Sequence, residues 1–265
     1  MKYVLIIGVI VLFSCNKKQI KKEYYQNGKL YKEYQVDNND VKDGYYKEYY
    51  ESGNISTTIF FKHGIIKDTI KKYYQNGDIE LKKINNILYT YDKNGMISEG
   101  KIINDKMIGW WKYYKKNNDT ISMKQFIEAP DEKPYFNQNV LYAKGKPIKE
   151  YSEFYELEKD TLKKEYLITY HSGTTQKRTI LTLFHNKNLK DDFSNLSVVK
   201  LDSVKIFHGT NKFKIPYTKN YIFKGFVTER TWEVSENINT QDYLDVNKIF
   251  NKTYINENWN HNDYP

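Results

Sequence analysis

The sequence predicts an all-β protein: a sheet built from tandem β-hairpins of one repeated type, followed by a smaller β-rich domain. The composition is the first sign, because 26 tyrosines, 13 phenylalanines and 4 tryptophans make aromatic residues 16% of a chain of 265 residues. Aromatic and β-branched side chains favour pleated surfaces. The second sign is a short phrase that recurs along the first half of the chain and ends in a turn sequence.

The repeated phrase joins one or two tyrosines to an Asn-Gly or Ser-Gly turn. It recurs at intervals of roughly 20 to 25 residues, as stacked structural repeats do, with one shorter interval before the fourth copy. The four full copies are Tyr24-Tyr25-Gln26-Asn27-Gly28, Tyr49-Tyr50-Glu51-Ser52-Gly53, Tyr73-Tyr74-Gln75-Asn76-Gly77 and Tyr91-Asp92-Lys93-Asn94-Gly95. A degenerate fifth copy begins at Tyr113 and has Asn118 in place of the glycine.

The end of the phrase is a hairpin signal. Asn-Gly between aromatic or apolar flanks is the strongest such signal, because both central residues of a type I′ turn have positive φ. Asn is the best substitute for Gly in a backbone of this kind. The predicted turn positions are Gly28, Gly53, Gly77, Gly95 and Asn118.

A second phrase precedes the turn and supplies the strands. The segment from Gly44 to Tyr50 aligns with the segment from Gly109 to Lys115. Alternation along a strand sends Trp111 and Tyr113 to one face of the sheet, and Trp110, Lys112 and Tyr114 to the other. The predicted repeat aromatics are Tyr25, Tyr46, Tyr50, Tyr74, Trp110, Trp111 and Tyr114.

Turn, aromatic residues and period together resemble the variant MORN repeat. The resemblance covers about residues 20–128. It implies a meandering array of β-hairpins used for association with proteins or membranes. Proteins that carry this variant are often catalogued as antitoxin-like, so the resemblance also implies a toxin-neutralising role as an alternative.

The N-terminus predicts export. The apolar run from Tyr3 to Phe13 is shorter than the roughly 18 to 20 residues that span a bilayer, so it is typical of a signal peptide. The following Leu12-Phe13-Ser14-Cys15 resembles a bacterial lipobox. The resemblance implies a signal peptide over 1–14, acylation of Cys15 and a basic tether over 15–22. Cys15 is the only cysteine of the chain, and its acyl chains would anchor the protein without a membrane-spanning helix.

Beyond the tether, the sequence predicts hairpin repeats over 23–128, a linker over 129–134 that contains two prolines, and a β-rich C-terminal domain over 135–265. The start of this domain resembles further degenerate copies of the hairpin repeat. Strand-length apolar runs follow Leu196, beginning with Val198-Val199. A short helix is expected after Thr240, and the polar tail from Asn256 is expected to fray.

The sequence predicts no catalytic residues, no metal and no cofactor. No HExxH, GxSxG, Walker or paired-cysteine motif is present in the sequence. The five histidines are His63, His171, His185, His208 and His261. The only acid-base or metal constellation that can be assembled joins His185 and His208 to Asp191-Asp192, and a polar loop is the simpler interpretation of the two aspartates.

The charge balance bears on the partners. With 42 basic against 33 acidic residues the formal charge is +9, yet Arg178 and Arg230 are the only arginines. Nucleic acid is therefore not the expected partner, since guanidinium groups supply the bidentate contacts of such surfaces. The sequence predicts a lipid-anchored, non-catalytic interaction or scaffold module of the cell envelope. It is expected on the outer membrane facing the periplasm, bound to the membrane through Cys15 and to another envelope protein. The alternatives are an antitoxin or immunity protein and, less favoured, an envelope hydrolase.

Overall fold

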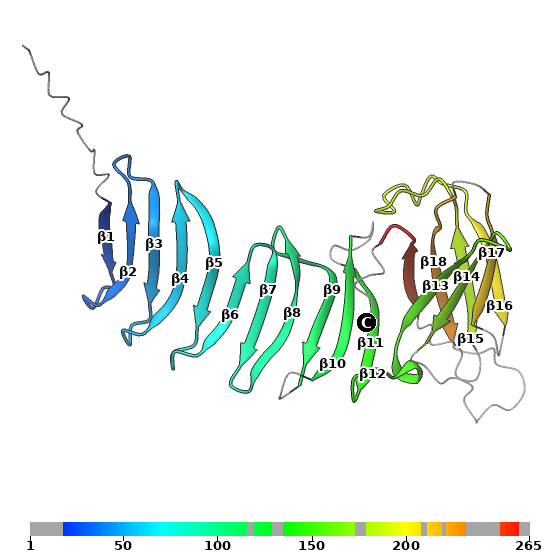
Figure 1. The fold of residues 1–265 in the computed structure, drawn as a ribbon, viewed down its shortest axis with the longest axis horizontal. Helices are drawn as coiled ribbons and strands as arrows, with labels where there is room; N and C mark the ends of the chain where they lie inside the picture. Colours follow the sequence, from blue (N-terminus) through cyan, green and yellow to red (C-terminus); the bar gives the residue numbers. More distant parts are fainter. Residues whose placement is uncertain are drawn as a thin grey trace, which may run out of the picture. The chain divides into compact units, whose positions relative to one another are not determined.

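The computed structural model describes residues 18–115, 119–128, 135–172, 179–207, 211–218, 221–231 and 250–259. In this part of the chain every regular element is a β-strand, apart from a 3₁₀ turn at Lys149–Tyr151 (Figure 1). The strands of the first half follow one another as antiparallel hairpins, and smaller sheets follow. The predicted fold class is confirmed.

The chain divides into two compact units, Met1–Asn85 and Asn86–Pro265. The first unit is a meander in which each strand pairs antiparallel with the next one along the chain. Its strands are β1 (Gln19–Tyr24), β2 (Leu30–Val36), β3 (Lys42–Tyr49), β4 (Ile55–Lys62), β5 (Ile65–Tyr73) and β6 (Ile79–Ile84).

The predicted turn positions of the first unit are turns, but their type differs from the prediction. The Gly28 amide donates to the Tyr25 carbonyl over 2.9 Å, and the Tyr25 amide donates to the Lys29 carbonyl over 2.8 Å. Only the glycine has a positive φ, +82°. This is a three-residue loop, a type I turn followed by a glycine bulge, rather than type I′. The Asn27 side chain supports it by accepting the Lys29 amide at 3.0 Å.

The same loop recurs at Gly53 and Gly77, which have φ of +94° and +89° and donate to the carbonyls of Tyr50 and Tyr74. At the other end of the strands, type I′ geometry is found at His63-Gly64, with φ of 50° and 76°. The connection from β2 to β3 at that end is again a three-residue loop, in which Asp40 has a φ of 67° and donates to the Asp37 carbonyl over 3.1 Å.

The fourth and fifth copies depart from this pattern. In the fourth, Asp92 pairs directly with Gly95, so the loop has lost one residue relative to the loop at Gly28. In the fifth, the Lys115 amide donates to the Asp119 carbonyl over 2.9 Å, as Tyr25 does to Lys29. Asn118 itself lies outside the described residues.

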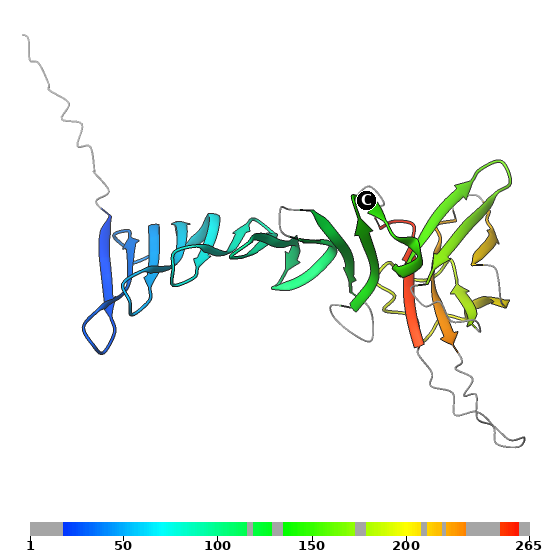
Figure 2. The same cartoon turned by 90° about the horizontal axis from the view of Figure 1, so that it is seen from below.

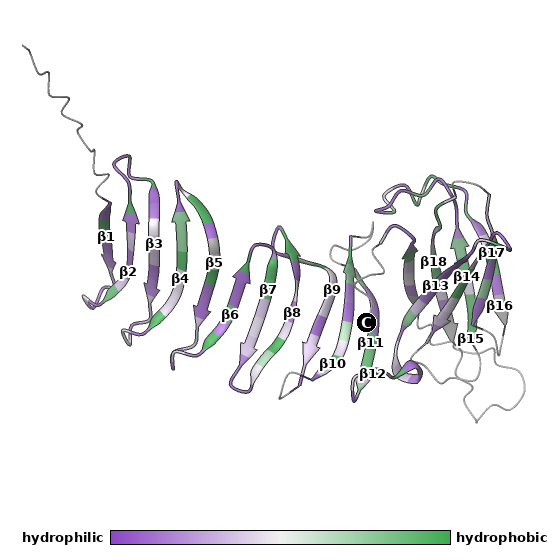
Figure 3. Cartoon of the chain, viewed as in Figure 1, coloured by the Kyte–Doolittle hydropathy of each residue, from purple (hydrophilic) through white to green (hydrophobic). Residues whose placement is uncertain are grey.

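The first unit is a single layer without a hydrophobic core (Figure 2). Among its described residues only Val36, Gly44, Tyr46 and Thr57 are buried. Polar and apolar residues are mixed along its strands (Figure 3), and aromatic side chains such as Tyr45 remain exposed. Stability must therefore come from contacts between neighbouring strands on both faces.

Tyrosine hydroxyls supply contacts from one hairpin to the next. The Tyr25 hydroxyl donates to the Tyr49 carbonyl over 2.5 Å, and the Tyr50 hydroxyl donates to the Tyr73 carbonyl over 2.5 Å. These two tyrosines occupy the same position of successive repeats. Tyr25 thus connects the turn at Gly28 to the end of β3, and Tyr50 connects the turn at Gly53 to the end of β5.

Long basic side chains cover the aromatic rings of this sheet. The Lys42 ammonium lies 4.6 Å from the ring centre of Tyr46, 5.1 Å from that of Phe61 and 5.5 Å from that of Tyr34. Such cation–π contacts stabilise partly exposed rings, and the lysine stem shields them from water. Part of the lysine content therefore has a structural role.

The second unit begins with further hairpin strands and ends in two smaller sheets. The hairpin strands are β7 (Ile87–Asp92), β8 (Gly95–Ile103), β9 (Lys106–Tyr114), β10 (Thr120–Ile127), β11 (Tyr135–Ala143) and β12 (Lys146–Pro147). The smaller sheets, in spatial order, contain β13 (Phe154–Asp160), β14 (Glu165–His171) and β17 (Lys212–Pro216), and β16 (Asp202–Phe207), β15 (Thr179–His185), β18 (Lys224–Thr231) and β19 (Phe250–Asn256).

The structure divides the chain at a different place from the predicted linker. Residues 129–134 lie outside the described residues, but β10 and β11 on either side of them form an antiparallel hairpin. The repeat-like sheet thus continues to Pro147.

The two small sheets enclose the main core of the second unit. Its largest fully buried side chains include Tyr166, Tyr170, Phe213 and Phe223. A second cluster joins Ile127 at the end of β10 to Phe226 and Tyr254, and to Leu189 and Phe193 from the loop after β15. This second cluster packs the last large hairpin against the small sheets.

Buried amide side chains complete that junction. The Asn137 side chain forms a paired contact with the backbone of Tyr254, accepting its amide at 2.7 Å and donating to its carbonyl at 2.9 Å. Gln125 accepts from both Asn137 and Gln138, and Gln138 accepts the Tyr155 amide at 3.1 Å. Strand β11 therefore contacts β13 and β19 through side chains that imitate backbone pairing.

Two predictions for the C-terminal part were wrong. Val198 lies in a turn and is 81% exposed, so the Val198-Val199 run is not a strand. The fraying predicted from Asn256 is wrong at its start, since Asn256 is fully buried at the end of β19, where β19 completes a sheet that the polar sequence around it does not reveal. Residues 260–265 of that tail lie outside the described residues. The helix expected after Thr240 lies outside the described residues.

Replacing Gly53 by Val should destabilise the protein by more than about 1 kcal/mol, because a β-branched residue is strained at positive φ. Gly53→Asn should lose much less stability, since Asn tolerates this conformation. Urea unfolding followed by circular dichroism measures both variants. Equal midpoints for Gly53→Val and the unmodified protein would contradict the loop geometry.

Candidate binding groove

An open groove of about 1110 Å³ lies on one face of the sheet of β7 to β11. All of its lining residues belong to the second unit. They are Ile87, Tyr89, Glu99, Gly100, Lys101, Ile108, Gly109, Trp110, Lys112, Lys115, Asp119, Thr120, Ile121, Met123, Tyr142, Ala143, Lys144 and Gly145.

The strand register places these side chains together. Glu99 lies opposite Tyr89 on one side and Lys112 on the other, while Lys101 lies opposite Ile108. Because alternate residues of a strand share a face, Trp110 and Lys112 of β9 both enter the groove. This agrees with the face expected for Trp110 from the alternation.

Trp111 lies on the opposite face and supports the floor of the groove. It is 2% exposed, and its indole nitrogen donates to the Lys101 carbonyl over 3.1 Å. A Cβ atom at Gly100 would lie 2.3 Å from the Trp111 ring. Gly100 is therefore required there, because only a residue without a side chain lets the indole pack flat against the strand.

Four lysines surround the groove: Lys101 on β8, Lys112 and Lys115 on and after β9, and Lys144 in the turn after β11. All four are exposed. Within the described part of the chain, their ammonium groups form no ion pair.

The acidic residues of the lining do not balance these lysines. Glu99 accepts the Tyr114 hydroxyl at 2.5 Å, and Asp119 is the only other carboxylate of the lining. Some lysines elsewhere have acidic partners, as in Lys32 with Glu23 at 2.8 Å and Lys149 with Glu156 at 2.7 Å. The groove is thus a local excess of positive charge.

The floor between the lysines is apolar. It is formed by the aliphatic side chains of Ile87, Ile108 and Ile121 and by aromatic rings, including Tyr142. The Tyr142 hydroxyl lies 3.7 Å from the Met123 sulfur, and burial raises the pKa of this phenol to about 12. The ring is therefore neutral over the physiological range.

The other predicted repeat aromatics have structural positions. Tyr46 is 7% exposed, and Tyr25 and Tyr50 form the hydroxyl contacts between hairpins described above. Tyr114 donates to Glu99, and Tyr74 is 37% exposed. Cys15 lies outside the described residues.

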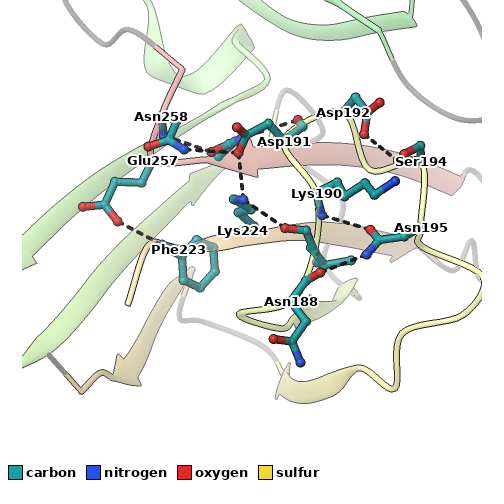
Figure 4. A network of polar contacts seen from close by, with 12 residues as sticks. Asn188, Lys190, Asp191, Asp192, Ser194, Asn195, Phe223, Lys224, Glu257 and Asn258 are labelled. Atoms are coloured by element: carbon teal, nitrogen blue, oxygen red, sulfur yellow. Dashed lines mark hydrogen bonds and ion pairs between the residues drawn. The ribbon is translucent and has the colours of Figure 1, made fainter. Parts of the chain in front are cut away.

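The two aspartates of the predicted constellation form polar contacts with other residues (Figure 4). Asp191 pairs with Lys224 at 2.8 Å and accepts from Asn258 at 3.1 Å. Lys224, the largest influence, lowers the pKa of the Asp191 carboxyl. Asp192 accepts the Ser194 amide at 3.0 Å. The two aspartates thus hold the loop after β15, which is the simpler interpretation given above.

The contacts of His185 are with residues other than these aspartates. His185 faces the Tyr221 hydroxyl at 3.2 Å and is the cross-strand neighbour of Asp202. His63 is exposed in its turn. His208 and His261 lie outside the described residues, and no group of metal-ligating side chains is found among the described ones.

A buried polar cluster in the second unit escaped the sequence analysis. The Ser172 hydroxyl donates to Glu229 at 2.7 Å, and the Tyr170 hydroxyl donates to Glu153 at 3.4 Å. Burial, followed by the charge of Glu229, raises the pKa of the Glu153 carboxyl. These residues come from strands far apart in the sequence, so no local pattern reveals the cluster.

Comparisons with known proteins add no relative. No protein-family model matches the chain, and no curated protein matches it in sequence. The described residues include no helix with the length and hydropathy of a membrane span.

Stability should fall as the pH drops from about 7.5 to 5.5, because burial lowers the pKa of both His185 and His171 below the 6.5 of free histidine. The unfolded chain then binds more protons than the folded one, so the loss starts as the pH approaches the unfolded pKa of about 6.5 from above. The double variant His185→Gln/His171→Gln should show a shallower loss. Thermal unfolding at several pH values measures this, and equal slopes for the two proteins would contradict it.

Proposed function

We propose that this protein is a lipid-anchored interaction module of the bacterial cell envelope, and that its groove binds a partner protein. The observation that carries this proposal is the groove itself, where four lysines without ion pairs in the described structure surround an apolar floor. An accessible apolar floor with a charged rim resembles a protein interface, in which apolar contacts supply binding energy and rim charges supply specificity.

Two sequence features support the envelope setting. The lipobox-like Leu12-Phe13-Ser14-Cys15 follows an apolar signal segment, so Cys15 would become the acylated N-terminus. The variant MORN resemblance supports a role in association. The hairpin sheet fits that role, since it holds a wide surface on rigid strands.

The alternatives have weaker support. The antitoxin role has only the family resemblance behind it. For the hydrolase, the aspartates that were its candidate residues are held by Lys224 and Ser194. We therefore keep the interaction module as the single proposed function.

The anchor is tested by metabolic labelling with palmitate in a bacterial host. The unmodified protein should incorporate label and sediment with membranes, whereas Cys15→Ser should remain unlabelled and keep its leader, because acylation needs the thiol. Ser14→Ala, which keeps a small residue at the cleavage position, should behave like the unmodified protein. Undiminished labelling of Cys15→Ser would overturn the anchor.

The interaction is tested by site-specific photo-crosslinking in cells. A photoreactive amino acid at Ile121, which lines the groove and is 42% exposed, should give a discrete adduct with another envelope protein. The same amino acid at Val198, 81% exposed and outside the groove lining, is the matched control. Identical adduct patterns from both positions, or none from Ile121, would contradict the proposal.

A further inference from the structure

We propose that the groove of β7 to β11 recognises an acidic, amphipathic peptide segment of its partner. The inference rests on the proposed function and goes beyond it by naming the chemistry of the segment: carboxylate side chains interleaved with aliphatic or aromatic ones. Three features of the groove support this ligand: the charge of its rim, its apolar floor and the polar groups of its lining.

The positive charge of the rim favours an anionic ligand. Lys101, Lys112, Lys115 and Lys144 come from different strands or turns and stand around one hollow. In the described structure none of them has a carboxylate partner, although lysines of both units elsewhere form ion pairs at 2.7 to 3.3 Å. Bringing carboxylates between these lysines would relieve their mutual repulsion and speed association.

The apolar floor favours a ligand with apolar side chains. Ile108 and Ile121 lie on neighbouring strands, and Trp110 and Tyr142 add aromatic surface. An exposed apolar floor gains free energy when aliphatic or aromatic groups cover it. A ligand with charge alone would leave this gain unused, so both kinds of group belong to the same ligand.

The polar groups of the lining distinguish a peptide from other polyanions. The described lining includes no Asn, Gln or Arg, whereas glycan recognition depends on side chains that exchange several hydrogen bonds with hydroxyl groups. Nucleic acids are bound with arginines at phosphates and bases, and the described lining contains none. Lysines can pair with carboxylates from many directions, which suits an extended peptide with alternating acidic residues.

The test uses the full-length protein solubilised in mild detergent, and fluorescein-labelled peptides. A short peptide in which Glu and Leu alternate should bind, as measured by fluorescence anisotropy, and its affinity should fall with added salt. The same peptide with Lys for Glu should not bind, and the one with Ser for Leu should bind much more weakly. Equal affinity for all three peptides would overturn the inference.

Protein variants locate the site. Lys101→Glu/Lys112→Glu should weaken binding about tenfold or more, because it reverses two rim charges. The matched control Lys22→Glu/Lys62→Glu makes the same change at exposed lysines of the first unit, and it should retain binding. The affinity of the neutral variant Lys101→Gln/Lys112→Gln should lie between those of the charge-reversed and control variants. It controls for a loss of binding that comes from misfolding of the charge-reversed variant. Equal losses in the control and rim variants would place binding elsewhere.

Two further outcomes separate this inference from the proposed function. If dextran sulfate binds as tightly as the acidic peptide and competes with it, the groove is a general polyanion site and the peptide assignment fails. If the crosslink at Ile121 persists while no acidic peptide binds, the interaction module stands and the acidic segment is wrong. Peptide binding without any crosslink would instead remove the proposed cellular partner.

Discussion

The structure depends on one constraint: a sheet with a single layer must stabilise each hairpin through its neighbours. In the first unit four residues of the described part are buried, so no core holds the strands together. The hydroxyls of Tyr25 and Tyr50 compensate by donating to backbone carbonyls at the end of a later strand. Each tyrosine therefore combines ring packing with a hydrogen bond, which Phe in the same place would lack.

The same constraint explains why the C-terminal sheets matter to the groove. A hairpin array ends in an edge strand that is open to pairing. In the second unit β11 is engaged by the side chain of Asn137, which pairs with the Tyr254 backbone, and by the Asn139 to Glu153 bridge. The last hairpin is thereby fixed against a packed core. The groove beside it is formed by paired strands, so its backbone needs little further ordering when a ligand binds.

Much of the architecture could be predicted, because it depends on short-range rules. Positive φ at a hairpin loop requires Gly or a close substitute, so Gly28, Gly53 and Gly77 mark loops of the sheet. Alternation along β9 separates Trp110 from Trp111. The prediction erred on the turn type, since a type I loop with a glycine bulge and a type I′ turn both accept Asn-Gly. The choice between them depends on strand register, which the dipeptide does not encode.

The sequence by itself therefore determined the fold class, the repeating hairpins and the faces of their aromatic residues, since these follow from turn chemistry and a period of two. Only the tertiary structure decided which lysines stand without carboxylates, because ion pairing depends on neighbours such as Asp191 for Lys224 that are distant in sequence. It also decided where the groove lies, because its lining residues come from several strands in register. Local patterns describe strands one at a time, whereas a binding surface is a property of several strands in register.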